Sequence, residues 1–271
     1  MRAAVCQMNG GGALADNVAT ALELLARAAI DGELRAVLPE LFGMSGSQRA
    51  MRETAEPVGG PLTSALADAA RTHAMWVLGG SMCEADGDRI FNTSLLIDPA
   101  GEVVARYRKI HLFDVDLPGQ EPIRESALFS AGDALVTSDV GAFRLGLSIC
   151  YDLRFPELYR GLMVAGATVL AVPSAFQAFT GKAHWEPLLR ARAIEEQSYV
   201  LAAAQWGPWG PPESGRRTYG HAAVVDPWGT VLAEAGDEGD GVFAVDLDPA
   251  EVRRVRATLP ALGHRRLGTA C

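Results

Sequence analysis

The stretch RLGLSICYDLRF, residues 144–155, changes from an apolar run to a polar turn within a few residues. Residues 143–150, FRLGLSIC, have the short apolar pattern of a buried strand. The segment that follows, FPELYRGLMVAG, has Pro156 near its start and Gly166 at its end, which are typical helix boundaries. A strand that leads directly into a helix predicts the repeating unit of an α/β protein.

The same alternation of strands and helices extends over most of the chain. Asp16 is the predicted N-cap of the first helix, and the sequences ADGD and PWGT predict hairpin turns. No Gly/Ser-rich linker divides the chain, so we expect one domain over residues 1–271. The further predicted strands are 3–8, 35–40, 75–82, 168–174 and 199–205, and the further predicted helices are 15–30, 61–74 and 184–198.

Composition narrows the class of protein. The 271 residues are 49% hydrophobic, which is enough for a substantial core. The formal net charge of −9 argues against a partner such as nucleic acid or an anionic membrane, because phosphate groups require concentrated Lys and Arg. There is no run of 18 apolar residues for a membrane span, and the N-terminal apolar run is too short for a signal peptide.

The four cysteines are scattered, with no CxxC pair. A disulfide scaffold or a structural zinc site is therefore not expected, and a reducing, cytoplasmic location is the simplest inference. Cys6 and Cys83 lie in apolar runs and are predicted to be core residues, whereas Cys271 ends the chain. Cys150 differs because it ends a predicted strand, at the edge of the sheet where α/β proteins hold their sites. Its context suits either a buried structural thiol or a nucleophile.

A nucleophilic thiol needs a base or a cation nearby. Among the histidines, His111 and His184 are candidates for a Cys–His arrangement, while the other three are expected to be solvated or structural. The alternative is a carboxylate with a lysine. Glu40 follows the apolar residues Val37, Leu38 and Pro39, and Lys109 stands at the end of another predicted strand. Charges placed there require pairing or a chemical role, and the residues alone leave both arrangements open.

Three segments taken together resemble the nitrilase superfamily of carbon–nitrogen hydrolases: LPELFGMSG (38–46), YRKIHLFD (107–114) and GLSICYDLRFPEL (146–158). The resemblance covers nearly the whole chain and implies a four-layer αββα sandwich, a single carbon–nitrogen hydrolase domain that commonly pairs into a homodimer or a higher homo-oligomer. It maps the base of this family onto Glu40, its lysine onto Lys109, its nucleophile onto Cys150 and its supporting glutamate onto Glu125.

The resemblance implies a cysteine acyl-enzyme mechanism on a small-molecule amide, with no metal and no organic cofactor. Lys109 and the backbone N–H of Tyr151 would hold the oxyanion. Lys109 would lower the pKa of the Cys150 thiol and Glu40 would oppose that effect, and the sequence does not decide between them.

The motifs are most similar to the branch that holds omega-amidase and deaminated-glutathione amidase, and within it they favour the deaminated-glutathione enzymes, which act in metabolite repair. The alternatives are an omega-amidase acting on α-ketoglutaramate, another aliphatic amide or carbamoyl hydrolase, and a non-catalytic small-molecule sensor or scaffold. Arg154 is the candidate for binding a substrate carboxylate, with a structural ion pair to Glu157 as its alternative. Phe176 and Thr180 are further pocket candidates. The segment 206–219, rich in Trp, Pro and Gly, does not match the branch.

Overall fold

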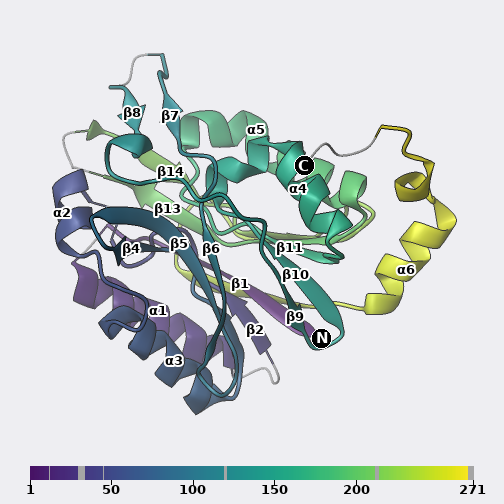
Figure 1. Ribbon diagram of the computed structural model, residues 1–271, viewed down its shortest axis with the longest axis horizontal. Coiled ribbons are helices and arrows are strands. Elements are labelled where there is room, and N and C mark those ends of the chain that lie inside the picture. The colour runs from purple at the N-terminus through teal and green to yellow at the C-terminus, as the bar shows by residue number, and fades with distance from the viewer. Residues whose placement is uncertain (12, 30–33, 45, 119–120, 211–213, 268–271) are drawn as a thin grey trace.

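The computed structural model describes residues 1–271 except 12, 30–33, 45, 119–120, 211–213 and 268–271. Two β-sheets lie face to face, with helices on their outer faces (Figure 1). The helices are α1 (Leu14–Ala29), α2 (Gln48–Glu53), α3 (Pro61–His73), α4 (Pro156–Val164), α5 (Ala178–Glu196) and α6 (Pro249–Thr258).

Within the described residues, nine strands form the first sheet, in the order β14–β13–β1–β2–β3–β5–β4, with β17 beside β1 and β6 beside β5. The strands β13, β1, β2 and β3 are mutually parallel neighbours, as the βα alternation predicts. Their bounds are β1 (Arg2–Met8), β2 (Leu34–Val37), β3 (Trp76–Leu78), β4 (Met82–Asp86), β5 (Arg89–Ile97), β6 (Val103–Arg108), β13 (Ala204–Pro208), β14 (Arg217–Tyr219) and β17 (Gly241–Asp246).

The second sheet has the order β16–β15–β12–β11–β10–β9, and its central strands β10, β11 and β12 are parallel. A separate hairpin pairs β7 with β8. The bounds are β7 (Asp114–Val115), β8 (Ile123–Arg124), β9 (Thr137–Val140), β10 (Phe143–Leu147), β11 (Val169–Ala171), β12 (Tyr199–Ala202), β15 (Ala223–Val225) and β16 (Val231–Glu234).

Side chains that alternate along the strands separate the layers. In β1, Ala3 and Val5 belong to the core between the sheets, whereas Ala4 and Cys6 belong to the core that includes the buried faces of α1 and α3. A small cavity of about 20 Å³ is lined from both sheets, by residues that include Val37, Leu78, Val169 and Leu201. The sheets therefore pack directly on each other.

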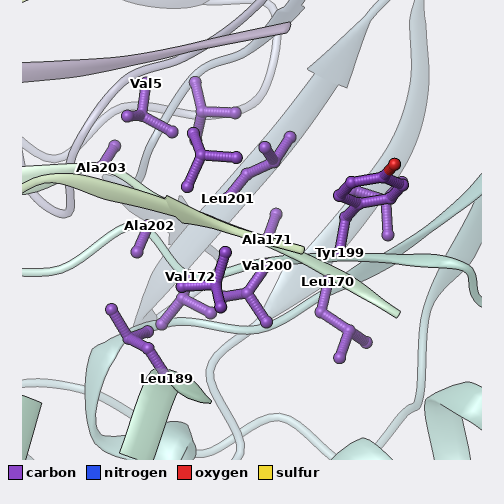
Figure 2. Packing of buried hydrophobic residues seen from close by; sticks show 14 of the residues in the cluster. Val5, Leu170, Ala171, Val172, Leu189, Tyr199, Val200, Leu201, Ala202 and Ala203 are labelled. Atoms are coloured by element: carbon purple, nitrogen blue, oxygen red, sulfur yellow. The ribbon is translucent and has the colours of Figure 1, made fainter. Parts of the chain in front are cut away.

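The outer face of the second sheet packs against helices. In Figure 2, Leu170 of β11 and Leu189 of α5 lie on one side of this sheet. Val5 of β1 and Leu201 of β12 lie on the other side. Gly146 allows α4 to approach closely, because a Cβ there would lie 3.1 Å from the Cβ of Leu162. The order helix, sheet, sheet, helix confirms the four-layer αββα sandwich.

Several predicted boundaries were wrong. Strand β2 ends at Val37, because Pro39 lacks the N–H that would continue a parallel ladder, so Glu40 lies in a turn and not on the strand. Helix α5 begins at Ala178, six residues before the predicted start, and accommodates Pro187 in its interior. Asp16 lies inside the first turn of α1, where its charge favours the helix N-terminus without serving as the N-cap.

The buried thiols of Cys6 and Cys83 lie in the core, as predicted. Burial raises the pKa of both thiols to about 12. In the part of the chain that the structure describes, no helix combines the length and the apolar character needed to cross a membrane.

The substitution Leu170→Ala tests the packing of the second sheet. Leu170 is fully buried, so we expect the free energy of unfolding to fall by about 2–5 kcal/mol from lost burial and from the cavity that remains. Urea denaturation followed by circular dichroism measures this. Leu232→Ala is the matched control, because Leu232 is 42% exposed and its truncation should change the free energy by about 0.5 kcal/mol or less. Equal effects of the two substitutions would contradict the assigned layers.

Candidate active site

Glu40 is held in a tight turn at the carboxyl end of β2. The next residue, Leu41, has a left-handed backbone with φ of 47°. The amide of Gln205 in β13 donates hydrogen bonds to the carbonyl oxygens of Glu40 and Leu41, at 3.0 and 3.3 Å. A parallel strand of the same sheet, separated from β2 by β1, therefore fixes this turn, and Glu40 is 4% exposed.

The predicted strand 143–150 ends early, because β10 stops at Leu147, and Cys150 lies three residues beyond it, where it opens a short 3₁₀ helix, η2 (Cys150–Arg154). Its φ of 48° is in the left-handed region, which is strained for a residue with a side chain. The buried Asp152 maintains this turn. Its carboxylate accepts hydrogen bonds from the N–H of Ile149 at 2.8 Å and the hydroxyl of Tyr107 at 2.7 Å, and it contacts Nδ1 of His111 at 2.7 Å.

Lys109 directly follows β6 and is 2% exposed. Its Nζ donates to Oε1 of Glu40 at 2.8 Å and to Oε2 and Oε1 of Glu125 at 2.8 and 3.1 Å. Burial by itself would lower the pKa of Lys109, but the attraction of Glu125 and Glu40 outweighs burial and holds the pKa well above its usual value. Lys109 is therefore a fixed cation between two carboxylates.

Backbone N–H groups complete the binding of both carboxylates. The N–H of Ala175, after β11, donates to Oε2 of Glu40 at 2.8 Å. The N–H of Phe113 donates to Oε2 of Glu125 at 2.6 Å. Each carboxylate thus has hydrogen-bond donors at both of its oxygens, which is what a buried charge requires.

Asn92 belongs to the candidate site, and the sequence reasoning missed it. This fully buried residue of β5 donates from Nδ2 to Oε1 of Glu40 at 2.9 Å and to Oε1 of Glu125 at 3.0 Å. One amide group therefore joins the two carboxylates. The available signal was a polar residue inside the apolar strand sequence IFNTSLLID, but alternation alone does not tell which face of a strand a residue occupies.

The thiol of Cys150 is protonated in the resting site. Burial, and next the negative charge of Glu40, raise the pKa of this thiol well above its ordinary value, and the attraction of Lys109 offsets them only in part. The thiol also hydrogen-bonds Glu40. The sequence left open whether Glu40 or Lys109 has the larger effect on the pKa of this thiol. Burial together with Glu40 has the larger effect, and the pKa is raised.

Neither histidine candidate partners Cys150 in the described part of the chain. Nδ1 of His111 contacts the carboxylate of Asp152, and the His111 ring stacks on Phe155 with ring centroids 3.7 Å apart. His184 contacts Arg154, with 3.1 Å between Nδ1 and Nη1. The geometry favours the carboxylate arrangement over the Cys–His arrangement.

A cavity of about 460 Å³ opens onto these groups. All eight side chains that the sequence singled out for catalysis, oxyanion binding or substrate binding line it: Glu40, Lys109, Glu125, Cys150, Tyr151, Arg154, Phe176 and Thr180. Tyr151 lies in the first turn of η2, where backbone N–H groups have no acceptor within the helix. The cavity thus brings a thiol, a carboxylate, a cation and an available backbone donor together.

Arg154 lies against the aromatic wall of this cavity. Its Cζ is 4.9 Å from the ring centroid of Phe176 and 5.9 Å from that of Tyr151. Among the described residues it forms no ion pair with Glu157 or with any other carboxylate. Burial lowers the pKa of the Arg154 guanidinium, although an arginine still carries its charge.

The segment 206–219 is a hairpin and not an irregular loop over its whole length. Strands β13 and β14 pair antiparallel, with Trp206 opposite Tyr219 and Pro208 opposite Arg217. Beyond the paired strands, Trp209, Gly210 and Arg216 line the cavity. The segment singled out by its composition therefore forms part of the site, apart from residues 211–213, which lie outside the described residues.

The chain is similar to known amidases and to solved structures over nearly its full length. The deaminated glutathione amidase of Bos taurus is 43% identical over 270 residues, which cover 97% of this chain and 81% of that protein. The omega-amidase NIT2 of Homo sapiens is 37% identical over 265 residues, which cover 98% and 95% of the two chains. The crystal structure of the C. elegans NitFhit protein matches with a TM-score of 0.89 and 38% identity, over 98% of this chain and 65% of the worm protein.

A family model described as carbon–nitrogen hydrolase matches residues 2–257. The resemblance that the motifs carry is thereby confirmed. With relatives about 40% identical over nearly the full length, the chain belongs to the carbon–nitrogen hydrolase family of the nitrilase superfamily.

Proposed function

We propose that this protein hydrolyses the amide bond of deaminated glutathione through an acyl-enzyme on Cys150, with Glu40, Lys109 and Glu125 as the other catalytic residues. The observation that carries the proposal is the Glu40 carboxylate, which hydrogen-bonds both Lys109 and the Cys150 thiol at the base of the cavity. The deaminated glutathione amidases that resemble this chain support the choice of substrate.

In the first half-reaction, the sulfur of Cys150 attacks the amide carbon and its proton passes to Glu40. The oxyanion that forms lies beside Lys109 and the N–H of Tyr151, which require no reorganisation to stabilise it. Glu40 then gives the proton to the amide nitrogen, the C–N bond breaks, and the amine leaves a thioester on Cys150. Because the thiol begins protonated, its deprotonation accompanies the attack and does not precede it.

In the second half-reaction, Glu40 takes a proton from a water molecule as its oxygen attacks the thioester carbon. The C–S bond breaks, the carboxylic acid product is released, and the proton returns from Glu40 to the sulfur of Cys150. Lys109 stabilises the oxyanion of this step as well. Glu125 and Asn92 keep Lys109 and Glu40 in place through both steps.

Arg154 is the proposed site for the carboxylate next to the ketone of the substrate. It is half-buried, faces the cavity and has no carboxylate partner in the described residues, so a substrate anion would complete its pairing. Phe176 supports its guanidinium from one side, and Thr180 lines the same wall.

α-Ketoglutaramate is the second candidate substrate, since the human omega-amidase NIT2 is similar over almost the entire chain. It carries the same carboxylate beside a ketone, so Arg154 would serve both compounds. A non-catalytic role on the same fold is disfavoured by the complete set of hydrogen bonds around a base and a thiol.

The proposal includes a cytoplasmic location and a homodimer or higher homo-oligomer. A nucleophilic thiol must stay reduced, which the cytoplasm ensures. Large apolar side chains of α5 and the adjoining β15–β16 turn are exposed, as expected of a surface that pairs with a second copy: Phe179, Ile194 and Trp228.

Substitution of the nucleophile tests the mechanism. For Cys150→Ala we expect kcat on deaminated glutathione to fall by at least about 10⁴-fold, because no thioester can form. Acid-quenched wild-type protein should carry an acyl adduct by mass spectrometry, and the variant should carry none. Cys6→Ala is the matched control, since Cys6 is a buried core thiol away from the cavity. Turnover by Cys150→Ala at the wild-type rate would contradict the mechanism.

The choice of substrate is tested by a side-by-side assay of deaminated glutathione and α-ketoglutaramate. We expect a higher kcat/KM for deaminated glutathione, because the cavity extends beyond the catalytic residues to the β13–β14 hairpin. Released cysteinylglycine and released ammonia are the two readouts. Equal or reversed values of kcat/KM would assign the enzyme to α-ketoglutaramate instead.

The raised pKa of Cys150 predicts how alkylation of the free enzyme depends on pH. Iodoacetamide reacts with the thiolate, and below the pKa of the thiol the thiolate fraction rises about tenfold per pH unit. The rate attributed to Cys150, after subtraction of the Cys150→Ala rate, should therefore rise from pH 6 to pH 9 without levelling. A plateau beginning below pH 8 would show a thiolate–Lys109 pair in the resting enzyme and refute the assignment of a neutral thiol.

A further inference from the structure

The cationic side chains around the cavity differ in whether their charge is already neutralised. Lys109 is paired with Glu40 and Glu125 as described above. Two arginines at the rim also have carboxylate partners, in the pairs Arg49–Glu53 at 2.8 Å and Arg124–Asp116 at 2.7 Å.

Two arginines of the cavity, Arg154 and Arg216, have no carboxylate partner anywhere in the described chain. Nη2 of Arg216 donates instead to the carbonyl oxygens of Glu121 and Pro122, at 3.1 and 3.5 Å. Neutral carbonyl groups orient the guanidinium but leave its charge uncompensated. A cavity with two such arginines suits a ligand with two anionic groups.

The two guanidinium groups come from well-separated parts of the cavity wall. Arg154 lies over Phe176, and the carbonyl oxygen of Phe176 accepts a hydrogen bond from the N–H of Tyr219 at 2.8 Å. Arg216 precedes Tyr219 by three residues on extended chain, so its backbone lies roughly 10 Å further along the hairpin. The N–H of Trp209 donates to the carbonyl oxygen of Arg216 at 2.9 Å, which holds this end of the hairpin together.

We propose that Arg216 binds a carboxylate on the leaving side of the substrate and thereby selects dicarboxylates whose scissile amide lies between the two acid groups. This inference rests on the proposed function, in which Arg154 takes the carboxylate beside the ketone. In deaminated glutathione the scissile nitrogen belongs to the cysteine of the leaving cysteinylglycine. The carboxylate of the glycine that follows lies about 7 Å from this nitrogen when the dipeptide is extended. α-Ketoglutaramate releases ammonia and offers Arg216 no group to bind.

The Trp- and Pro-rich hairpin thereby has a role in selecting the substrate, because it carries Arg216. Trp209 packs against an apolar cluster that includes Met51, Leu128 and Phe129, which fixes the hairpin beside the cavity. Arg216 therefore lies on a hairpin that is packed against the rest of the protein, and not on an isolated loop. The residue proposed to select a peptide leaving group therefore lies on a different segment of the chain from the proposed catalytic residues.

The experiment compares deaminated glutathione with its C-terminal amide, in which the glycine carboxylate is neutral, and with α-ketoglutaramate. For the wild-type enzyme, amidation should lower kcat/KM by about 10- to 100-fold, chiefly through KM. Arg216→Gln should lower kcat/KM on deaminated glutathione by a similar factor and should then show no further loss on the amide. Its turnover of α-ketoglutaramate should stay within twofold of wild type.

Arg217→Gln is the matched control, because the adjacent Arg217 pairs with Glu238 and does not line the cavity. It should leave all three substrates unchanged. Two results would overturn the role of Arg216: a wild-type enzyme indifferent to amidation, or an Arg216→Gln variant that loses activity equally on α-ketoglutaramate and deaminated glutathione. A wild-type enzyme that prefers α-ketoglutaramate would instead contradict the proposed function, so the two failures are distinguishable.

Discussion

The buried arrangement of one ammonium group between two carboxylates is the constraint on which the site depends. The side chains of Lys109 and Glu40 are 2% and 5% exposed and that of Glu125 is 10% exposed, and charges so little in contact with water are stable only if their oxygens and protons find partners. The partners come from separate elements: β5 supplies Asn92, the turn after β11 supplies Ala175, and the segment before β7 supplies Phe113. The two sheets must be packed in one register for all of these groups to meet.

In the proposed mechanism, this arrangement allows a neutral thiol to serve as the nucleophile. Burial, and next the negative charge of Glu40, raise the pKa of the Cys150 thiol and so oppose a thiolate in the resting enzyme, although Lys109 offsets them in part. The same negative charge makes Glu40 a ready acceptor of the proton when the sulfur attacks. The left-handed backbone of Cys150, which Asp152 maintains, holds the sulfur at the edge of the cavity while that transfer occurs.

Local sequence signals predicted an α/β protein with helices on its sheets, and the family resemblance added the four layers and the candidate catalytic residues, whereas contacts between distant segments were beyond both. Glu40 and Lys109 were identified because a charge after an apolar strand is unusual, and the motif resemblance joined them to Cys150. Asn92 carries no such signal, since its partners are 52 and 33 residues away along the chain. The helix α5 begins six residues before its predicted start and holds Pro187 in its interior, so its first turns were missed as well.

The hydrogen bonds of Glu40 have one consequence for the order of events in the proposed mechanism. Oε1 accepts from both Lys109 and Asn92, which occupies its two lone pairs, while Oε2 accepts from the N–H of Ala175 and, among the described residues, has one lone pair left for the Cys150 thiol. A single lone pair therefore remains for exchange with the reacting groups. Thiol, amine and water must each use that one point in space, so the amine has to depart before the water molecule can be activated.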